Sequence, residues 1–398
     1  MKLILSLVII VALAYLSSRI FFSMKRIPLQ LRFISLTGIE FIVLGYILGR
    51  NVLGLIDETV LVQMRPAVGL GMAWVGLVFG LQFNWKNMKR LPPAIYNQSL
   101  GQALLVWLFI FIIAYLVFTK GFSLYERYLI PSLIVLASSA SISSPTLIPL
   151  LARYDRARGR TTRLLEQISS MDAVIGILFL SVVYSMWRRG GDTSITEGMT
   201  LLILSVACGV ILALMFKTFV KEIRSDSELL MLTLAMVIFS GGISLYLKLS
   251  PLFINFIFGV TLANIHWPNY RIFKVLAIPE KPIYFMFLIL SGAIWYLQHW
   301  AVLLSALFYV LLRIITKAVS NYTLAQAIYR RRNIPRRLGL GLIPQGGIPV
   351  AIAINFNQVY TDDFCSAVAS TIILSIVLNE LLGPTLARNV LRKAGDIR

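Results

Sequence analysis

The sequence has few charged residues and few of the side chains that build metal centres or disulfide frameworks. Asp, Glu, Lys and Arg make up 14% of the chain, whereas a soluble domain has about 25%. The two cysteines, Cys208 and Cys365, are far apart in the sequence, as are the two histidines, His266 and His299. This spacing excludes a disulfide framework and a zinc site. There is also no phosphate-binding loop or catalytic triad, so the sequence predicts neither an enzyme nor a bound cofactor.

The sequence is instead rich in long apolar runs, and 58% of the residues are hydrophobic. Runs of about 20 residues, the length of a membrane-crossing helix, recur from end to end. In lipid such runs are helical, because the backbone has no other hydrogen-bond partners. The sequence therefore predicts an all-α polytopic membrane protein with about 13 transmembrane helices, at 3–22, 34–54, 67–83, 98–118, 129–152, 164–187, 198–220, 228–247, 250–265, 282–299, 301–328, 338–357 and 364–388.

The net charge of +20 comes from short basic clusters between the apolar runs. Such clusters are typical of cytoplasmic loops in membrane proteins and do not predict nucleic-acid binding. They alternate along the chain, which predicts a multi-pass protein of the cell membrane (inner or plasma) with its N-terminus outside and its C-terminus in the cytoplasm. The richest cluster, 153–163, is interpreted as a solvated cytoplasmic loop, with a regulatory or lipid-binding patch as the alternative.

Two predicted spans contain helix-breaking residues near their centres. The span at 129–152 includes SSASISSPTLIP at 138–149, and the span at 338–357 includes IPQGGIP at 343–349. Proline removes a backbone donor and interrupts a helix. A matched pair of interrupted spans is typical of secondary transporters built from inverted repeats. The pair lies seven spans apart, which predicts two inverted six-helix repeats whose broken helices cross, with breaks at Pro145, Gly346, Gly347 and Pro349. Two ordinary kinked helices are the alternative.

Asp172 lies near the middle of the span at 164–187. A charged Asp at the bilayer centre costs about 2.5–3.5 kcal/mol on insertion scales, so it is rarely present for packing. Arg313 and Lys317 lie at a similar depth in the span at 301–328, four residues apart and so on one helix face. These charges can neutralise one another around a hydrated cavity. We therefore expect an ion or proton site at Asp172, with Arg313 and Lys317 as its charge partners.

Neighbouring polar residues complete the candidate site. The hydroxyls of Ser143, Ser144 and Thr146 could supply oxygens to a monovalent cation, or could bond the preceding turn of their own helix. Two further acids, Glu40 and Glu380, lie toward the inner ends of their spans. Each is interpreted either as lining a cytoplasmic access funnel or as a helix–helix hydrogen-bond partner.

Several motifs, taken in order along the chain, resemble the sodium/hydrogen exchanger family within the monovalent cation:proton antiporter superfamily. They are EFIVLGYILG at 40–49, FGLQF at 79–83, Ser144-Pro145, SSMD at 169–172, RIITK at 313–317, PQGG at 344–347 and ELLGP at 380–384. They extend over nearly the whole chain. The chain departs from the family in having neither paired acids nor Asn-Asp at position 172. Ser144 replaces an Asp of some members, and Gln345 replaces an Arg of others.

The resemblance implies a homodimer whose scaffold helices surround a core that moves as an elevator. The scaffold would come from 1–118 and 228–299, mainly 1–83 and 228–299, and the ion-transporting core from 98–187 and 301–392. The segment 198–222 would be a linker helix, and the whole would form a single membrane domain in the lipid bilayer.

These observations predict a secondary active transporter that exchanges Na⁺ or K⁺ for protons by alternating access at Asp172. The metal ion would be the transported cation and not a resident cofactor. One titrating acid implies one proton per cation, unless Lys317 also gives up a proton. An anion or organic-anion transporter of the same fold is the first alternative, because Arg313 and Lys317 outnumber Asp172. A channel-like cation efflux protein is the second.

Overall fold

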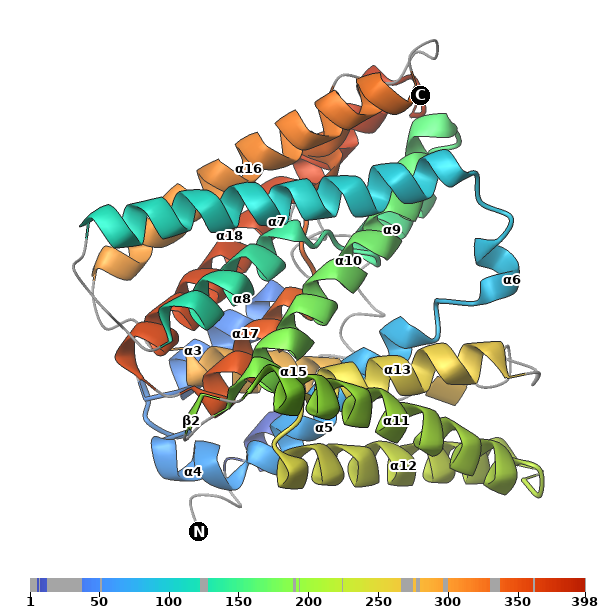
Figure 1. Ribbon diagram of the computed structural model, residues 1–398, viewed down its shortest axis with the longest axis vertical. Helices are drawn as coiled ribbons and strands as arrows, with labels where there is room; N and C mark the ends of the chain where they lie inside the picture. The colour runs from blue at the N-terminus through green and yellow to red at the C-terminus, as the bar shows by residue number, and fades with distance from the viewer. Residues whose placement is uncertain are drawn as a thin grey trace. The chain divides into compact units, whose positions relative to one another are not determined.

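The computed structural model describes residues 6, 8–12, 38–50, 52–121, 128–188, 191–192, 194–223, 225–265, 275–276, 280–295, 300–329, 337–360 and 362–397 (Figure 1). Most of the predicted span at 3–22 lies outside these residues, as do His266 and His299. The chain forms two compact units, Met1–Arg90 with Tyr184–Tyr296 and Leu91–Val183 with Leu297–Arg398. Each unit therefore combines a segment from the first half of the chain with one from the second half.

In its described residues, the first unit contains helices, the two-residue antiparallel strands β1 (Trp187–Arg188) and β2 (Gly191–Asp192), and an isolated bridge between Gly49 and Ile56. Its helices are α3 (Ile39–Leu48), α4 (Glu58–Gln63), α5 (Arg65–Gly80), α6 (Trp85–Met88), α11 (Ile195–Val220), α12 (Asp226–Leu247), α13 (Pro251–Asn264) and α15 (Glu280–Ile294). Serine hydroxyls begin three of them, because Ser194, Ser225 and Ser250 each accept a bond from a first-turn backbone N–H. Helix α5 packs against α13, and α3 packs against α15.

Glycine brings α3 and α15 into close contact. A Cβ atom at Gly45 would overlap the backbone carbonyl of Ile289, and one at Gly292 would overlap that of Ile42. Small residues allow helices in membranes to approach closely enough for backbone contact, where no hydrophobic effect drives their association. The first unit is thus held together by close packing of apolar helices.

The second unit contains α7 (Pro93–Gly121), α8 (Leu129–Ser141), α9 (Leu147–Tyr154) and most of α10 (Arg160–Met186). Its later part contains α16 (Trp300–Ile328), the 3₁₀-helix η1 (Leu338–Leu342), α17 (Gly347–Val359) and α18 (Asp363–Lys393). Helices α7 and α16 lie side by side, and α18 packs against α16, η1 and α17. All the interrupted helices of the candidate site therefore belong to this unit.

Both predicted interruptions are confirmed. The backbone leaves the helix between α8 and α9 at residues 142–146, and again between η1 and α17 at residues 343–346. Each predicted span from 34–54 onward overlaps at least one helix of the structure, with boundaries that differ by a few residues. The two spans with a break are each divided into two helical segments, because proline and glycine interrupt the apolar run there.

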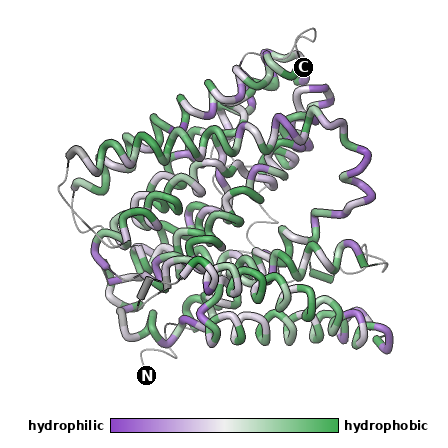
Figure 2. The backbone as a smooth tube through the Cα atoms, viewed as in Figure 1, coloured by the Kyte–Doolittle hydropathy of each residue, from purple (hydrophilic) through white to green (hydrophobic). Residues whose placement is uncertain are grey.

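Within the described part of the chain, six helices are long and apolar enough to cross a membrane: α7, α10, α11, α12, α16 and α18. Six shorter apolar helices of 10–17 residues accompany them among the described residues. Figure 2 shows hydrophobic residues along the helices and hydrophilic residues gathered in several of the connections between them. The prediction of a helical multi-pass membrane protein is confirmed, while the count of 13 spans and the inverted repeats remain predictions.

Candidate functional site

The two interruptions meet in the interior of the second unit. The backbone N–H of Ser144 donates to the carbonyl oxygen of Pro344 across 2.7 Å, which joins the break after α8 to the break before α17. Gly346 has a φ of 73° and a ψ of −161°, a backbone conformation that favours glycine. The helix breakers of the sequence therefore produce two non-helical segments in contact, whose peptide groups can bind side chains.

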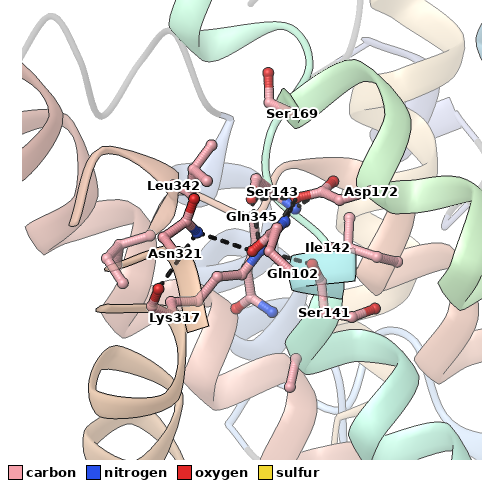
Figure 3. Close-up of polar contacts among 12 residues, drawn as sticks. Gln102, Ser141, Ile142, Ser143, Ser169, Asp172, Lys317, Asn321, Leu342 and Gln345 are labelled. Carbon is pink, nitrogen blue, oxygen red and sulfur yellow. Dashed lines mark hydrogen bonds and ion pairs between the residues drawn. The ribbon is translucent and has the colours of Figure 1, made fainter. Parts of the chain in front are cut away.

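Asp172 of α10 points at the first of these segments (Figure 3). Its side chain is fully buried, and its carboxylate accepts bonds from the backbone N–H of Ser143 at 3.0 Å and from the Ser143 hydroxyl at 2.5 Å. The amide of Gln102 on α7 donates to the same carboxylate across 3.2 Å. Three elements thus converge on one acid, which is the arrangement expected of a binding site and not of a packing contact.

Lys317 of α16 forms a buried ion pair with Asp172, with 3.1 Å between Nζ and Oδ2. The ammonium also donates to the carbonyl oxygen of Ser141 at 2.6 Å and to the hydroxyl of Ser143 at 2.8 Å. All three ammonium hydrogens therefore have oxygen partners. A buried ion pair is stable only with such additional hydrogen bonds, because each charge loses its hydration.

Arg313, which the sequence predicts as a charge partner of Asp172, makes its hydrogen bonds to backbone carbonyls and not to that carboxylate. Its guanidinium donates to four carbonyl oxygens at the ends of two helical segments: Ala140 at 3.0 Å, Ile142 at 2.6 Å, Leu342 at 3.4 Å and Ile343 at 2.5 Å. A cation at the C-terminal end of a helix binds the unpaired carbonyls and offsets the negative end of the helix dipole. Arg313 thus stabilises the ends of both α8 and η1.

Glu380 of α18 makes the complementary contact at the other side of the second break. Its Oε1 accepts a bond from the backbone N–H of Gln345 at 2.9 Å and another from that of Gly346, at the start of α17. The side chain is buried. Gln345 in turn accepts a bond from Asn379 at 2.9 Å and donates to the carbonyl of Ser139 at 3.0 Å. A carboxylate at a helix N-terminus binds the unpaired N–H groups there.

The remaining predicted residues lie around this centre or away from it. The Ser144 hydroxyl accepts a bond from the backbone N–H of Leu147 and so caps α9, while Thr146 is exposed. Pro145 lies in the first break, and Gly347 and Pro349 lie in the first turn of α17. Glu40 is in the first turn of α3 in the first unit, and its Oε2 atom is buried with no hydrogen-bond partner among the described residues. Of the predicted oxygen donors, Ser143 is the one that bonds Asp172.

The sequence reasoning missed a chain of amide side chains that extends from Asp172. The Gln102 oxygen accepts from Asn321 at 3.0 Å, and the Asn321 oxygen accepts from Gln98 at 2.9 Å. All three side chains are buried. Their spacing is the signal that could have revealed them, because Gln98 and Gln102 are four residues apart in an apolar run, and so are Lys317 and Asn321. In the described part of the chain, no cluster of three or more His, Cys, Asp or Glu residues could hold a metal ion.

Comparison with known proteins gives a matching family and a similar fold. The family described as sodium/hydrogen exchanger, transmembrane, matches residues 4–388. The fold is similar to the structure of the sodium proton antiporter MjNhaP1 from Methanocaldococcus jannaschii at pH 8, with a TM-score of 0.70 and 16% identity over 99% of each chain. An electron-microscopy map of that antiporter gives a TM-score of 0.67 at 16% identity, covering 98% of this chain and 97% of the other. No curated protein sequence matches significantly.

Proposed function

Because the chain belongs to the sodium/hydrogen exchanger family, and is thus a membrane transporter and not an enzyme, we propose that it exchanges Na⁺ or K⁺ for protons at Asp172. The observation that supports this site is the coordination of Lys317. Its ammonium is held by three oxygens, those of Asp172, Ser143 and the Ser141 carbonyl, at 2.6–3.1 Å. Oxygen ligands of this kind are also what a hard monovalent cation prefers.

In this mechanism the Lys317 ammonium and the transported cation compete for the same oxygens. When Na⁺ or K⁺ enters, it replaces the ammonium at the Asp172 carboxylate, and Lys317 releases a proton and becomes neutral. When a proton returns, the ion pair forms again and the cation is released. In both states the Asp172 carboxylate is paired with one positive charge, which lowers the cost of moving the site through the membrane.

Alternating access would come from movement of the second unit as a core, with the first unit as a scaffold. The two interrupted helices, Asp172 and Lys317 all belong to the second unit, so the site would move as one body. We further propose a homodimer in the cell membrane, with the N-terminus outside and the C-terminus in the cytoplasm. The anion alternative receives less support, because Arg313 and Lys317 are both engaged with oxygens of the protein.

Exchange in proteoliposomes tests the proposal. A pH gradient is imposed and its dissipation by Na⁺ or K⁺ is followed with a fluorescent dye, for the wild type and for Asp172→Asn. The variant removes the charge that holds the cation, so exchange should fall to the background of empty vesicles. Glu166→Gln is the matched control, since it makes the same chemical change on the same helix outside the site. Full exchange by Asp172→Asn would show that another residue carries the ion.

A further inference from the structure

Helix α10, which carries Asp172, begins at Arg160 directly after a glycine. Gly159 has no side chain to accept a bond from the first-turn N–H groups, which a helix leaves unpaired. The Asp396 carboxylate, beyond the end of α18, takes that role. Its Oδ2 accepts from the backbone N–H of Thr162 at 2.7 Å and from the Thr162 hydroxyl at 2.8 Å. The cap of α10 is thus supplied by a residue more than 230 positions away along the chain.

Other contacts place the Asp396 carboxylate at the helix start. The backbone N–H of Arg158 donates to the carbonyl oxygen of Asp396 at 3.2 Å. A Cβ atom at position 159 would overlap the Asp396 carboxylate, so glycine is what allows the approach. The chain turns after α18 through Gly395, with a φ of 76°, and the Asp396 N–H bonds the Leu391 carbonyl at 3.0 Å.

A separate ion pair joins the same two segments. Arg388 of α18 lies 3.0 Å from the Asp155 carboxylate in the connection between α9 and α10. Helix α18 also carries Glu380, which binds the start of α17. One helix therefore holds both the beginning of α10 and the beginning of the second interrupted helix.

We propose that Asp396 is a positioning residue for the ion site, acting through α10 on Asp172. By capping α10 it fixes that helix on α18, and with it the distances among Asp172, Ser143 and Lys317. Loss of the cap releases the first turn of α10 and loosens the geometry that binds the cation. The transport part of this inference rests on the proposed function, whereas the cap itself can be tested without transport.

Hydrogen exchange of backbone amides tests the cap. In Asp396→Ala the Thr162 amide should exchange roughly fivefold faster, the effect expected when a capping side chain is removed. Asp396→Asn should exchange at the wild-type rate, because Asn caps a helix as well as Asp. The matched control is Asp362→Ala. Asp362 is at the N-cap position of α18 but makes no side-chain cap bond, so Thr162 should not change in that variant. Unchanged exchange in Asp396→Ala would overturn the assignment.

Transport kinetics test the positioning role. Asp396→Ala should raise the KM for Na⁺ or K⁺ at least threefold and change the maximal rate less, since the site is loosened but its groups remain. Asp396→Asn should restore the KM to within twofold of wild type. A normal KM in Asp396→Ala, or failure of Asp396→Asn to restore it, would overturn the role. If the wild type moves neither ion, the proposed function fails, while hydrogen exchange still reports on the cap.

Discussion

The two units of the molecule differ in their buried charged residues. In the part of the chain that the structure describes, the four charged residues that are buried as a whole lie in the second unit: Asp172, Arg313, Lys317 and Glu380. Glu40 of the first unit is only partly buried. The first unit buries neutral polar side chains, such as Ser240 and Asn255, which bond each other at 2.7 Å. Its close packing is made by glycine, as at Gly45 and Gly292.

The backbone explains the difference. Uninterrupted helices satisfy most of their own peptide groups, so the first unit does not need buried charges to bind them. The breaks in the second unit leave carbonyls at the ends of α8 and η1 and N–H groups at the start of α17 without helical partners, and such groups are costly in a membrane. Arg313, Lys317 and Glu380 satisfy them. The broken helices and the buried charges therefore stabilise each other, and Asp172 completes the balance of charge.

The largest effect that tests this comparison should follow from Lys317→Met. It leaves the Asp172 charge buried without its cation, and breaking a buried pair costs about 3–5 kcal/mol. We expect a large loss of thermal stability in detergent, measured by the unfolding temperature. The double variant Asp172→Asn with Lys317→Met should recover part of the loss, because no unpaired charge remains. A single variant as stable as the wild type would show that the pair does not support the fold.

Much of the second unit could be predicted from residue types alone. Asp172 and Lys317 were evident because charges are rare in apolar runs, and the breaks were evident from proline and glycine. The sequence could not show which cation meets the acid. Arg313 and Lys317 share a helix face, and only the placement of the α8 and η1 carbonyls assigns Arg313 to the backbone and Lys317 to Asp172.

Neutral partners were the harder part. Gln102 and Asn321 carry no charge, so their burial in an apolar run gives a weak signal, even though Gln102 donates to Asp172 and accepts a bond from Asn321. The cap of α10 by Asp396 could not be predicted from the sequence either. Capping patterns are recognised within one segment of the chain, whereas this cap joins two segments that are far apart in the sequence. The same holds for Gly45, whose contact with Ile289 depends on which helices pair.

A smaller effect should show that packing in the first unit supports stability without affecting ion binding. Gly45→Ala places a methyl group against the Ile289 carbonyl, and such overpacking costs about 1–3 kcal/mol. Gly242→Ala is the control, because a Cβ there meets nothing within 4 Å and alanine favours the helix. We expect a lower unfolding temperature for Gly45→Ala only, with the KM for the cation unchanged in both. A raised KM in Gly45→Ala would mean that packing in the first unit also shapes the site.

The smallest effect, that of Glu380→Gln, helps to show whether Glu380 acts by its charge or as a hydrogen-bond acceptor. Glu380→Gln keeps an oxygen for the N–H groups of Gln345 and Gly346, so a loss of about 1 kcal/mol is expected. Glu380→Ala leaves both groups buried without an acceptor and should cost about 1–3 kcal/mol more. Unfolding of the two variants side by side measures the difference. If they are equally unstable, the negative charge beside Arg313 is what the second unit requires, and its interrupted backbone is held by charge balance and not by capping.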